Sequence, residues 1–191
     1  KQLYKEHPYG RTVLGSVDHL KNPSLAKMYA FYGAYYVPNN MAVALSGDFD
    51  PKAVLEVLER ELGRWAPKTL FKRKTRDYPP PLDAERVEVR YEAEEEVVLA
   101  WKTANQNHAD ADALTVLDML MDNAESGLVN LRLNQAQKVK QAGSHPSLQN
   151  EGGAWHLWAV PKEGQTLEEA EKLLLDTVKA LSAGEFDEAD M

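Results

Sequence analysis

The sequence predicts an α+β protein made of two related sheet-and-helix units, the first of them incomplete. One plan, an apolar strand, a short glycine-containing turn, an N-capped amphipathic helix and a glycine after it, occurs from residue 40 to 62 and again from 154 to 181. A proline-rich segment lies between the two copies, as is common for linkers between domains. We therefore expect the back of a first repeat over 1–67, a linker over 68–82, and most of a second repeat over 83–191.

The composition excludes several kinds of site. The 191 residues include no cysteine, which rules out disulfides, cysteine-ligated zinc, iron–sulfur clusters and thiol nucleophiles within this chain. The net charge of −8 argues against a general nucleic-acid binder, because neutralising phosphates requires a surplus of lysine and arginine. We interpret the one basic cluster, in the proline-rich segment, as part of a solvated linker. No apolar run approaches the length of a membrane span, and no signal-peptide pattern opens the sequence.

In the first unit, a loop over residues 1–20 is expected to precede a helix, a strand and a second helix. The first helix repeats aromatic side chains at steps of three and four residues, so we expect one of its sides to be buried. Residues 41–45 are apolar at every position, which is typical of a strand covered on both faces. Asp50 as the N-cap and Pro51 at the first helical position begin the second helix, and Gly63 ends it. The aromatic set of the first helix comprises Tyr29, Phe31, Tyr32, Tyr35 and Tyr36, with Met28 beside them.

The second unit is expected to open with two strands. Residues 86–91 alternate between apolar and charged side chains, which indicates a half-exposed strand, and residues 97–101 are apolar throughout. A helix that begins at Asn107 or His108 and extends through Met121 follows, with leucines on its buried side. Ser126 is a suitable cap for a shorter helix after it.

The rest of the second unit is predicted to contain an irregular stretch, a buried strand and a long helix. A glycine and a proline within residues 141–147 favour irregular backbone there. Residues 155–160 form another apolar strand. Thr166 and Glu169 have the spacing of a capping box, and the helix that they begin extends to Gly184.

A search for chemistry in these residues is negative. The five histidines are His7, His19, His108, His145 and His156. No two stand three to five residues apart, so no helix offers two imidazoles to one ion. We interpret His156 as a core residue of its strand, His108 as a helix-start residue and His7 as a turn residue. Nucleophile-elbow and phosphate-loop motifs are also absent from the sequence. The residue patterns therefore predict no catalytic and no metal-binding residue in this chain, and they leave any substrate-binding residue unknown.

Two stretches carry a distinctive succession of motifs. Residues 7–20 read HPYGRTVLGSVDHL, and residues 31–65 carry in order a helix ending Tyr-Tyr-x-Pro-x-Asn, a strand ending Gly-Asp, a helix and a tryptophan. They resemble the pitrilysin/insulinase family of zinc metallopeptidases, the inverzincins. This succession is similar to that of the family, and residues 108–120 and 127–135 resemble the first two helices of the family's second repeat. The resemblance implies the LuxS/MPP-like metallopeptidase fold.

In that family an inverted His-x-x-Glu-His motif holds the catalytic zinc, and its glutamate activates the zinc-bound water. This sequence contains no such motif, and the family pattern places it before the His-Pro-Tyr-Gly loop, hence upstream of Lys1. A Gly-Leu-Ala-Tyr stretch of many family members is replaced by KQAGS at residues 140–144. The resemblance thus implies an internal fragment that lacks the zinc-binding motif, with zinc in the full-length parent and none in this segment.

The leading hypothesis is a fragment of a zinc-dependent metalloendopeptidase that supplies scaffold and chamber wall and is itself inactive. The partners implied are a peptide substrate, the missing N-terminal part, and a homologous second half or partner subunit; neither nucleic acid nor a membrane span is expected. One alternative is a catalytically inactive family homologue that acts as partner subunit or peptide-binding chamber wall. Another is an unrelated α+β module that binds a small ligand. The sequence leaves the compartment unknown; our working expectation is a bacterial protein, exported or periplasmic.

Overall fold

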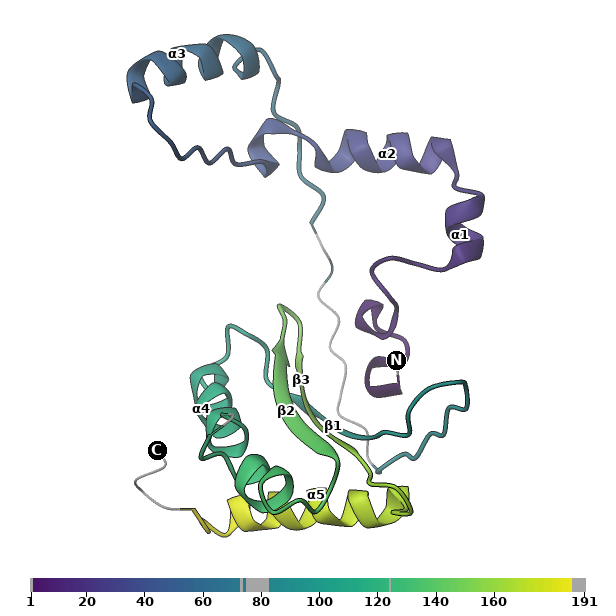
Figure 1. Ribbon diagram of the computed structural model, residues 1–191. Coiled ribbons are helices and arrows are strands. Elements are labelled where there is room, and N and C mark those ends of the chain that lie inside the picture. Colours follow the sequence, from purple (N-terminus) through teal and green to yellow (C-terminus); the bar gives the residue numbers. More distant parts are fainter. Residues whose placement is uncertain (1, 73, 75–82, 124, 187–191) are drawn as a thin grey trace. The chain divides into compact units, whose positions relative to one another are not determined.

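The structure is a computed structural model that describes residues 2–72, 74, 83–123 and 125–186 (Figure 1). Its contacts divide the chain into two compact units. The larger combines residues 1–10 with residues 76–191, and the smaller comprises residues 11–75.

The larger unit is built on a three-stranded antiparallel sheet in the order β1-β3-β2. The strands are β1 (Val97–Thr103), β2 (Gln141–Leu148) and β3 (Gly153–Val160). Central β3 pairs with both neighbours, so that Leu157 lies opposite Leu99 on one side and Ser144 on the other. The prediction that the apolar stretches 97–101 and 155–160 are strands is confirmed by β1 and β3.

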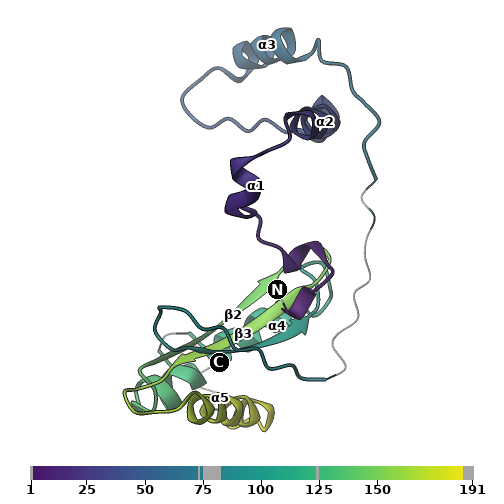
Figure 2. The ribbon, with the colours of Figure 1, turned by 90° about the vertical axis from the view of Figure 1, so that its right-hand side faces the viewer.

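Helices cover one face of this sheet. They are α4 (Ala111–Met121), the π-helical turn η4 (Asn130–Asn134) and α5 (Leu167–Ser182). Figures 1 and 2 show α5 lying along one side of the strands. Two short 3-10 turns at the start of the chain, η1 (Gln2–Tyr4) and η2 (Pro8–Gly10), also belong to this unit.

The core of the larger unit lies between the sheet and these helices. Met121 of α4, Leu133 of η4, Leu157 of β3 and Leu174 of α5 are each at most 1% exposed and belong to one apolar cluster. Burying a side chain of this size contributes about 1.5–3 kcal/mol. Four elements distant in the sequence are therefore held together by shared apolar burial.

Helix α5 begins as its sequence predicts. The Thr166 hydroxyl accepts the Glu169 backbone N–H at 3.2 Å, and the Glu169 carboxylate accepts the Thr166 backbone N–H at 2.9 Å. Both halves of the capping box are thus formed, satisfying two donors that a helix start leaves unpaired.

Other predictions for this unit are wrong. Residues 141–147, predicted to be irregular, form β2, because pairing with β3 outweighs the local preferences of Gly143 and Pro146 on an edge strand. Residues 86–91, predicted as a strand, belong to no strand of the described structure. The helix predicted from residue 107 begins at Ala111. Asn123 rather than Ser126 caps the next turn: its side-chain oxygen accepts backbone N–H groups of both Ser126 and Gly127, at 2.8 and 2.9 Å.

The smaller unit contains α1 (Val17–Lys21), α2 (Leu25–Tyr35), the 3-10 turn η3 (Pro38–Asn40) and α3 (Pro51–Leu62). The predicted start of α3 is confirmed, since the Asp50 carboxylate accepts the Lys52 backbone N–H at 2.8 Å and Pro51 occupies the first helical position. Gly63 follows the last turn of α3 as expected. Helix α1 replaces part of the loop predicted over residues 1–20.

Two predictions for the smaller unit are wrong in the same way. The aromatic face of α2 was expected to be buried, yet Tyr29 and Phe31 are 70% and 58% exposed. Residues 41–45 form no strand, and Val43 is 56% exposed. A strand requires a hydrogen-bonding partner, and no strand is present among the described residues of this unit to supply one. Most of the predicted linker, residues 73 and 75–82, lies outside the described residues.

Candidate functional site

A buried polar cluster joins the start of the chain to the turn between β2 and β3. The side chains of His7 and Glu151 are 1% and 9% exposed, and His7 Nε2 lies 2.9 Å from a Glu151 carboxylate oxygen. His7 Nδ1 accepts the backbone N–H of Tyr9 at 3.2 Å, and the Tyr9 hydroxyl accepts the backbone N–H of Glu151 at 3.1 Å. The Tyr4 hydroxyl donates to the Gly153 carbonyl at 2.7 Å. Burial is the main cause that raises the pKa of Tyr4.

A second polar group, which also lies in the larger unit, is a pair of histidines on neighbouring strands. His145 of β2 and His156 of β3 lie directly opposite, with ring centroids 4.8 Å apart and planes 15° from parallel. Burial and then the nearby His145 lower the pKa of His156, which favours its neutral form. The buried Nδ1 atom of His156 has no hydrogen-bond partner among the described residues.

A third polar group ties α4 to the sheet. One carboxylate oxygen of Asp118 accepts the Ser144 hydroxyl at 2.6 Å and the Trp155 indole N–H at 2.7 Å. One turn later, Asp122 accepts the backbone N–H of Ser144 at 2.9 Å. Each carboxylate is satisfied by strand donors, so this group is best explained as a structural connection between helix and sheet.

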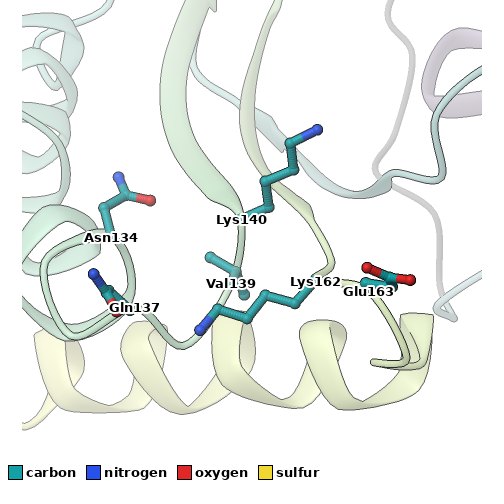
Figure 3. A pocket seen from close by; sticks show the side chains of 6 residues that line it. All are labelled: Asn134, Gln137, Val139, Lys140, Lys162 and Glu163. Carbon is teal, nitrogen blue, oxygen red and sulfur yellow. The ribbon is translucent and has the colours of Figure 1, made fainter.

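One surface depression among the described residues is shallow and lined mainly by polar residues. Its volume is about 430 Å³, and Figure 3 shows the six side chains around it, of which only Val139 is apolar. Lys140, one of these six residues, forms an ion pair with Glu94. Pockets for small molecules are mostly apolar with a few convergent polar groups, which this depression lacks.

None of these groups fits a zinc ion. No group of three or more histidine, cysteine, aspartate or glutamate residues among the described residues is arranged to hold a metal. The His145 and His156 rings are nearly parallel, whereas an ion bound by both must lie in both ring planes at about 2.0–2.1 Å from each nitrogen. His7 already uses both ring nitrogens. His19 lies in α1, and His108 lies beside Asp110 at 3.5 Å, just before α4.

The sequence indicated the His-Pro-Tyr-Gly turn but not its partner. His7 and Glu151 are separated by 144 residues, and no local pattern marks Glu151 as the acceptor. The same is true of the contacts of Asp118 with Ser144 and Trp155. Among the described residues, no helix is both long and apolar enough to cross a bilayer.

The fold is similar to that of solved bacterial proteases. A crystal structure of a protease from Helicobacter pylori matches with a TM-score of 0.79 and 24% identity, covering 96% of this chain and 45% of that one. The periplasmic protease PqqL from Escherichia coli matches with a TM-score of 0.59 and 14% identity, covering 92% of this chain and 20% of that one. These likenesses confirm an α+β fold of the kind found in that class of protease.

The chain belongs to the family described as the peptidase M16 inactive domain, which matches residues 23–191. Zinc protease PqqE of Helicobacter pylori is 25% identical over 198 residues, covering 98% of this chain and 44% of that protein. A probable zinc protease PqqL of Haemophilus influenzae is 27% identical over 135 residues, covering 70% of this chain and 15% of that protein. The chain therefore spans less than half the length of these relatives. The resemblance noted from the sequence is confirmed at the level of the family.

Proposed function

We propose that this chain is a segment of a zinc-dependent metalloendopeptidase in which it supplies scaffold and chamber wall. The observation that carries the proposal is the match of residues 23–191 to an inactive domain of a peptidase family. Relatives named as zinc proteases support it. The parent protein hydrolyses peptide bonds with a zinc-activated water held by residues outside this chain.

Within that parent, residues 1–67 form the back of the first repeat and residues 83–191 most of the second. Support comes from the exposed apolar surface of the smaller unit. Helix α2 is apolar on all sides, and a helix of this kind is normally buried. The remaining part of the first repeat covers it, and residues 41–45 gain strand partners there.

The segment contributes no zinc ligand and no catalytic residue in this proposal. The failure of the described histidines to fit an ion supports this assignment. In this proposal the segment holds a rigid sheet beside the substrate chamber. The apolar core shared by β3, α4 and α5 supports that role. The substrate is a peptide, and the partners are the rest of the first repeat and a homologous second half or subunit. The name of the periplasmic relative PqqL supports a bacterial, periplasmic location.

A catalytically inactive homologue that pairs with an active subunit is the second candidate. The match to an inactive domain supports both candidates equally, because the family description refers to this domain and not to the whole parent protein.

Experiments on the longer protein that contains this chain decide between the two candidates. We expect it to contain a His-x-x-Glu-His motif, to retain about one zinc per chain, and to cleave unstructured peptides in a reaction that a chelator abolishes and added zinc restores. Substituting glutamine for the glutamate of that motif is expected to abolish cleavage while zinc is retained. A parent without the motif and without zinc would instead be the inactive homologue.

A further inference from the structure

We propose that residues 2–10 act as a clasp by which the first repeat grips the second, with His7 as its positioning residue. The clasp is the contact of residues 2–10 with Glu151, Gly152 and Gly153 at the β2–β3 turn. The proposal rests on the repeat boundaries of the proposed function, because only then do residues 2–10 belong to a different repeat from the turn that they contact.

The clasp is buried and specific in shape. Tyr4 and His7 are 8% and 1% exposed. The rings of Tyr4, His7 and Tyr9 pack together at centroid distances of 4.4 to 5.6 Å. Lys102 of β1 places its ammonium 4.9 Å from the centre of the Tyr4 ring.

The turn has the glycines that this packing requires. A Cβ atom at Gly152 would lie 2.4 Å from the Tyr4 hydroxyl oxygen. At Gly10, a Cβ atom would lie 2.4 Å from the Tyr4 carbonyl oxygen, so both sides of the contact depend on a missing side chain. The short 3-10 turns keep the segment compact, with Gly10 N–H donating to the His7 carbonyl at 2.9 Å.

The hydrogen bonds fix the tautomer of His7. A backbone N–H can only donate, so Nδ1, which receives the Tyr9 N–H, carries no proton. The proton of the neutral ring is then on Nε2, where it donates to Glu151 at 2.9 Å. The His7 ring thus forms one hydrogen bond within its own segment, to the Tyr9 N–H, and one to the β2–β3 turn, to the Glu151 carboxylate. His7 orients the aromatic rings through these two bonds and joins the two sides directly.

These contacts give the proposed repeats a noncovalent connection in addition to the linker. The connection reaches the start of the His-Pro-Tyr-Gly stretch, far from residues 68–82 in sequence. The side chains of Tyr4, His7 and Glu151 lie outside the apolar cluster of the sheet and helices. We therefore expect the clasp to open without unfolding that core.

Cutting the chain between the repeats tests the clasp. A specific protease site is inserted after Phe71, which is 71% exposed, and the cleaved full chain is passed over a size-exclusion column. We expect the two pieces to elute together. Glu151→Ala, which removes the acceptor of His7, is expected to weaken their association by about tenfold or more, whereas Glu151→Gln, which keeps an acceptor oxygen, holds them together more firmly than alanine does.

His108→Ala, a substitution of an exposed histidine outside the clasp, is the matched control and should leave co-elution unchanged. Circular dichroism of each variant checks that the larger unit remains folded. Nitrogen NMR of His7 should show a protonated Nε2 and an unprotonated Nδ1. Separation of the cleaved wild-type pieces, or firm association of the Glu151→Ala pieces, would overturn the clasp. Neither result bears on peptidase activity of the parent, so failure of this proposal is distinct from failure of the proposed function.

Discussion

Replacing Asp118 tests whether the half-buried carboxylate of α4 holds the helix to the sheet. Asp118→Ala removes the acceptor of the Ser144 hydroxyl and of the Trp155 indole N–H, two bonds of 2.6 and 2.7 Å. A hydrogen bond to a charged group contributes about 1.5–3 kcal/mol. The hydroxyl can turn towards water, but the indole N–H of Trp155, a residue 8% exposed, cannot easily do so. We therefore expect a loss of about 2–4 kcal/mol in the free energy of unfolding.

Urea unfolding, followed by tryptophan fluorescence and by circular dichroism, measures this loss. Asp118→Asn keeps one oxygen in place and should cost about half as much. Asp112→Ala removes an exposed carboxylate from the first turn of the same helix and should cost less than about 1 kcal/mol. Trp155→Phe combined with Asp118→Ala should cost less than the sum of the two separate changes. The reasoning is refuted if Asp118→Ala is no more destabilising than Asp112→Ala, or if the two changes simply add.

Three further changes address the sheet, the capping box and the histidine pair. Gly143→Ala places a Cβ atom 2.9 Å from the Trp158 ring and should lower the free energy of unfolding by about 1–3 kcal/mol, while Gly164→Ala, whose Cβ meets no atom within 4 Å, tests backbone strain alone. Thr166→Ala should cost about 1 kcal/mol, and Thr166→Ser should restore most of it; equal stability of the alanine variant would contradict the capping box. The lowered pKa of His156 means that the unfolded chain takes up its proton first, so stability should fall as the pH drops below about 6.5. His156→Gln should flatten that pH dependence in urea unfolding, and an unchanged slope would contradict the assignment.

Local signals in the sequence were sufficient where a short stretch determines the structure. The capping box at Thr166 and Glu169 and the start of α3 at Asp50 depend on atoms within three residues of each other, and both are confirmed. The apolar strands β1 and β3 were also predicted correctly, from short apolar runs bounded by turn signals.

Signals failed where distant segments decide the structure. Strand β2 contains a glycine and a proline, yet Asn134 holds its start through two bonds of 2.9 Å to the backbone of Ala142, and β3 pairs along its length. A reading of residues 141–147 alone could not include these partners. Residues 41–45 are the converse case: they form no strand, because an apolar run becomes a strand only when a partner strand is beside it.

The candidate sites likewise were predictable where the signal is local and unpredictable where distant segments meet. The turn around His7 was recognisable from its histidine, proline and glycine, but its bond to Glu151 spans 144 residues. The absence of two histidines at helical spacing, by contrast, was readable directly from the sequence, and it underlies the prediction that this chain holds no catalytic zinc.

Zinc content, measured side by side for this chain and for the longer protein that contains it, tests the central claim most directly. Both are purified, dialysed and analysed for metal, and each is assayed for cleavage of an unstructured peptide with and without chelator. We expect about one zinc per chain and chelator-sensitive cleavage in the longer protein, and neither in the present chain. Tightly held zinc together with chelator-sensitive cleavage in the present chain would contradict the assignment of this segment as scaffold.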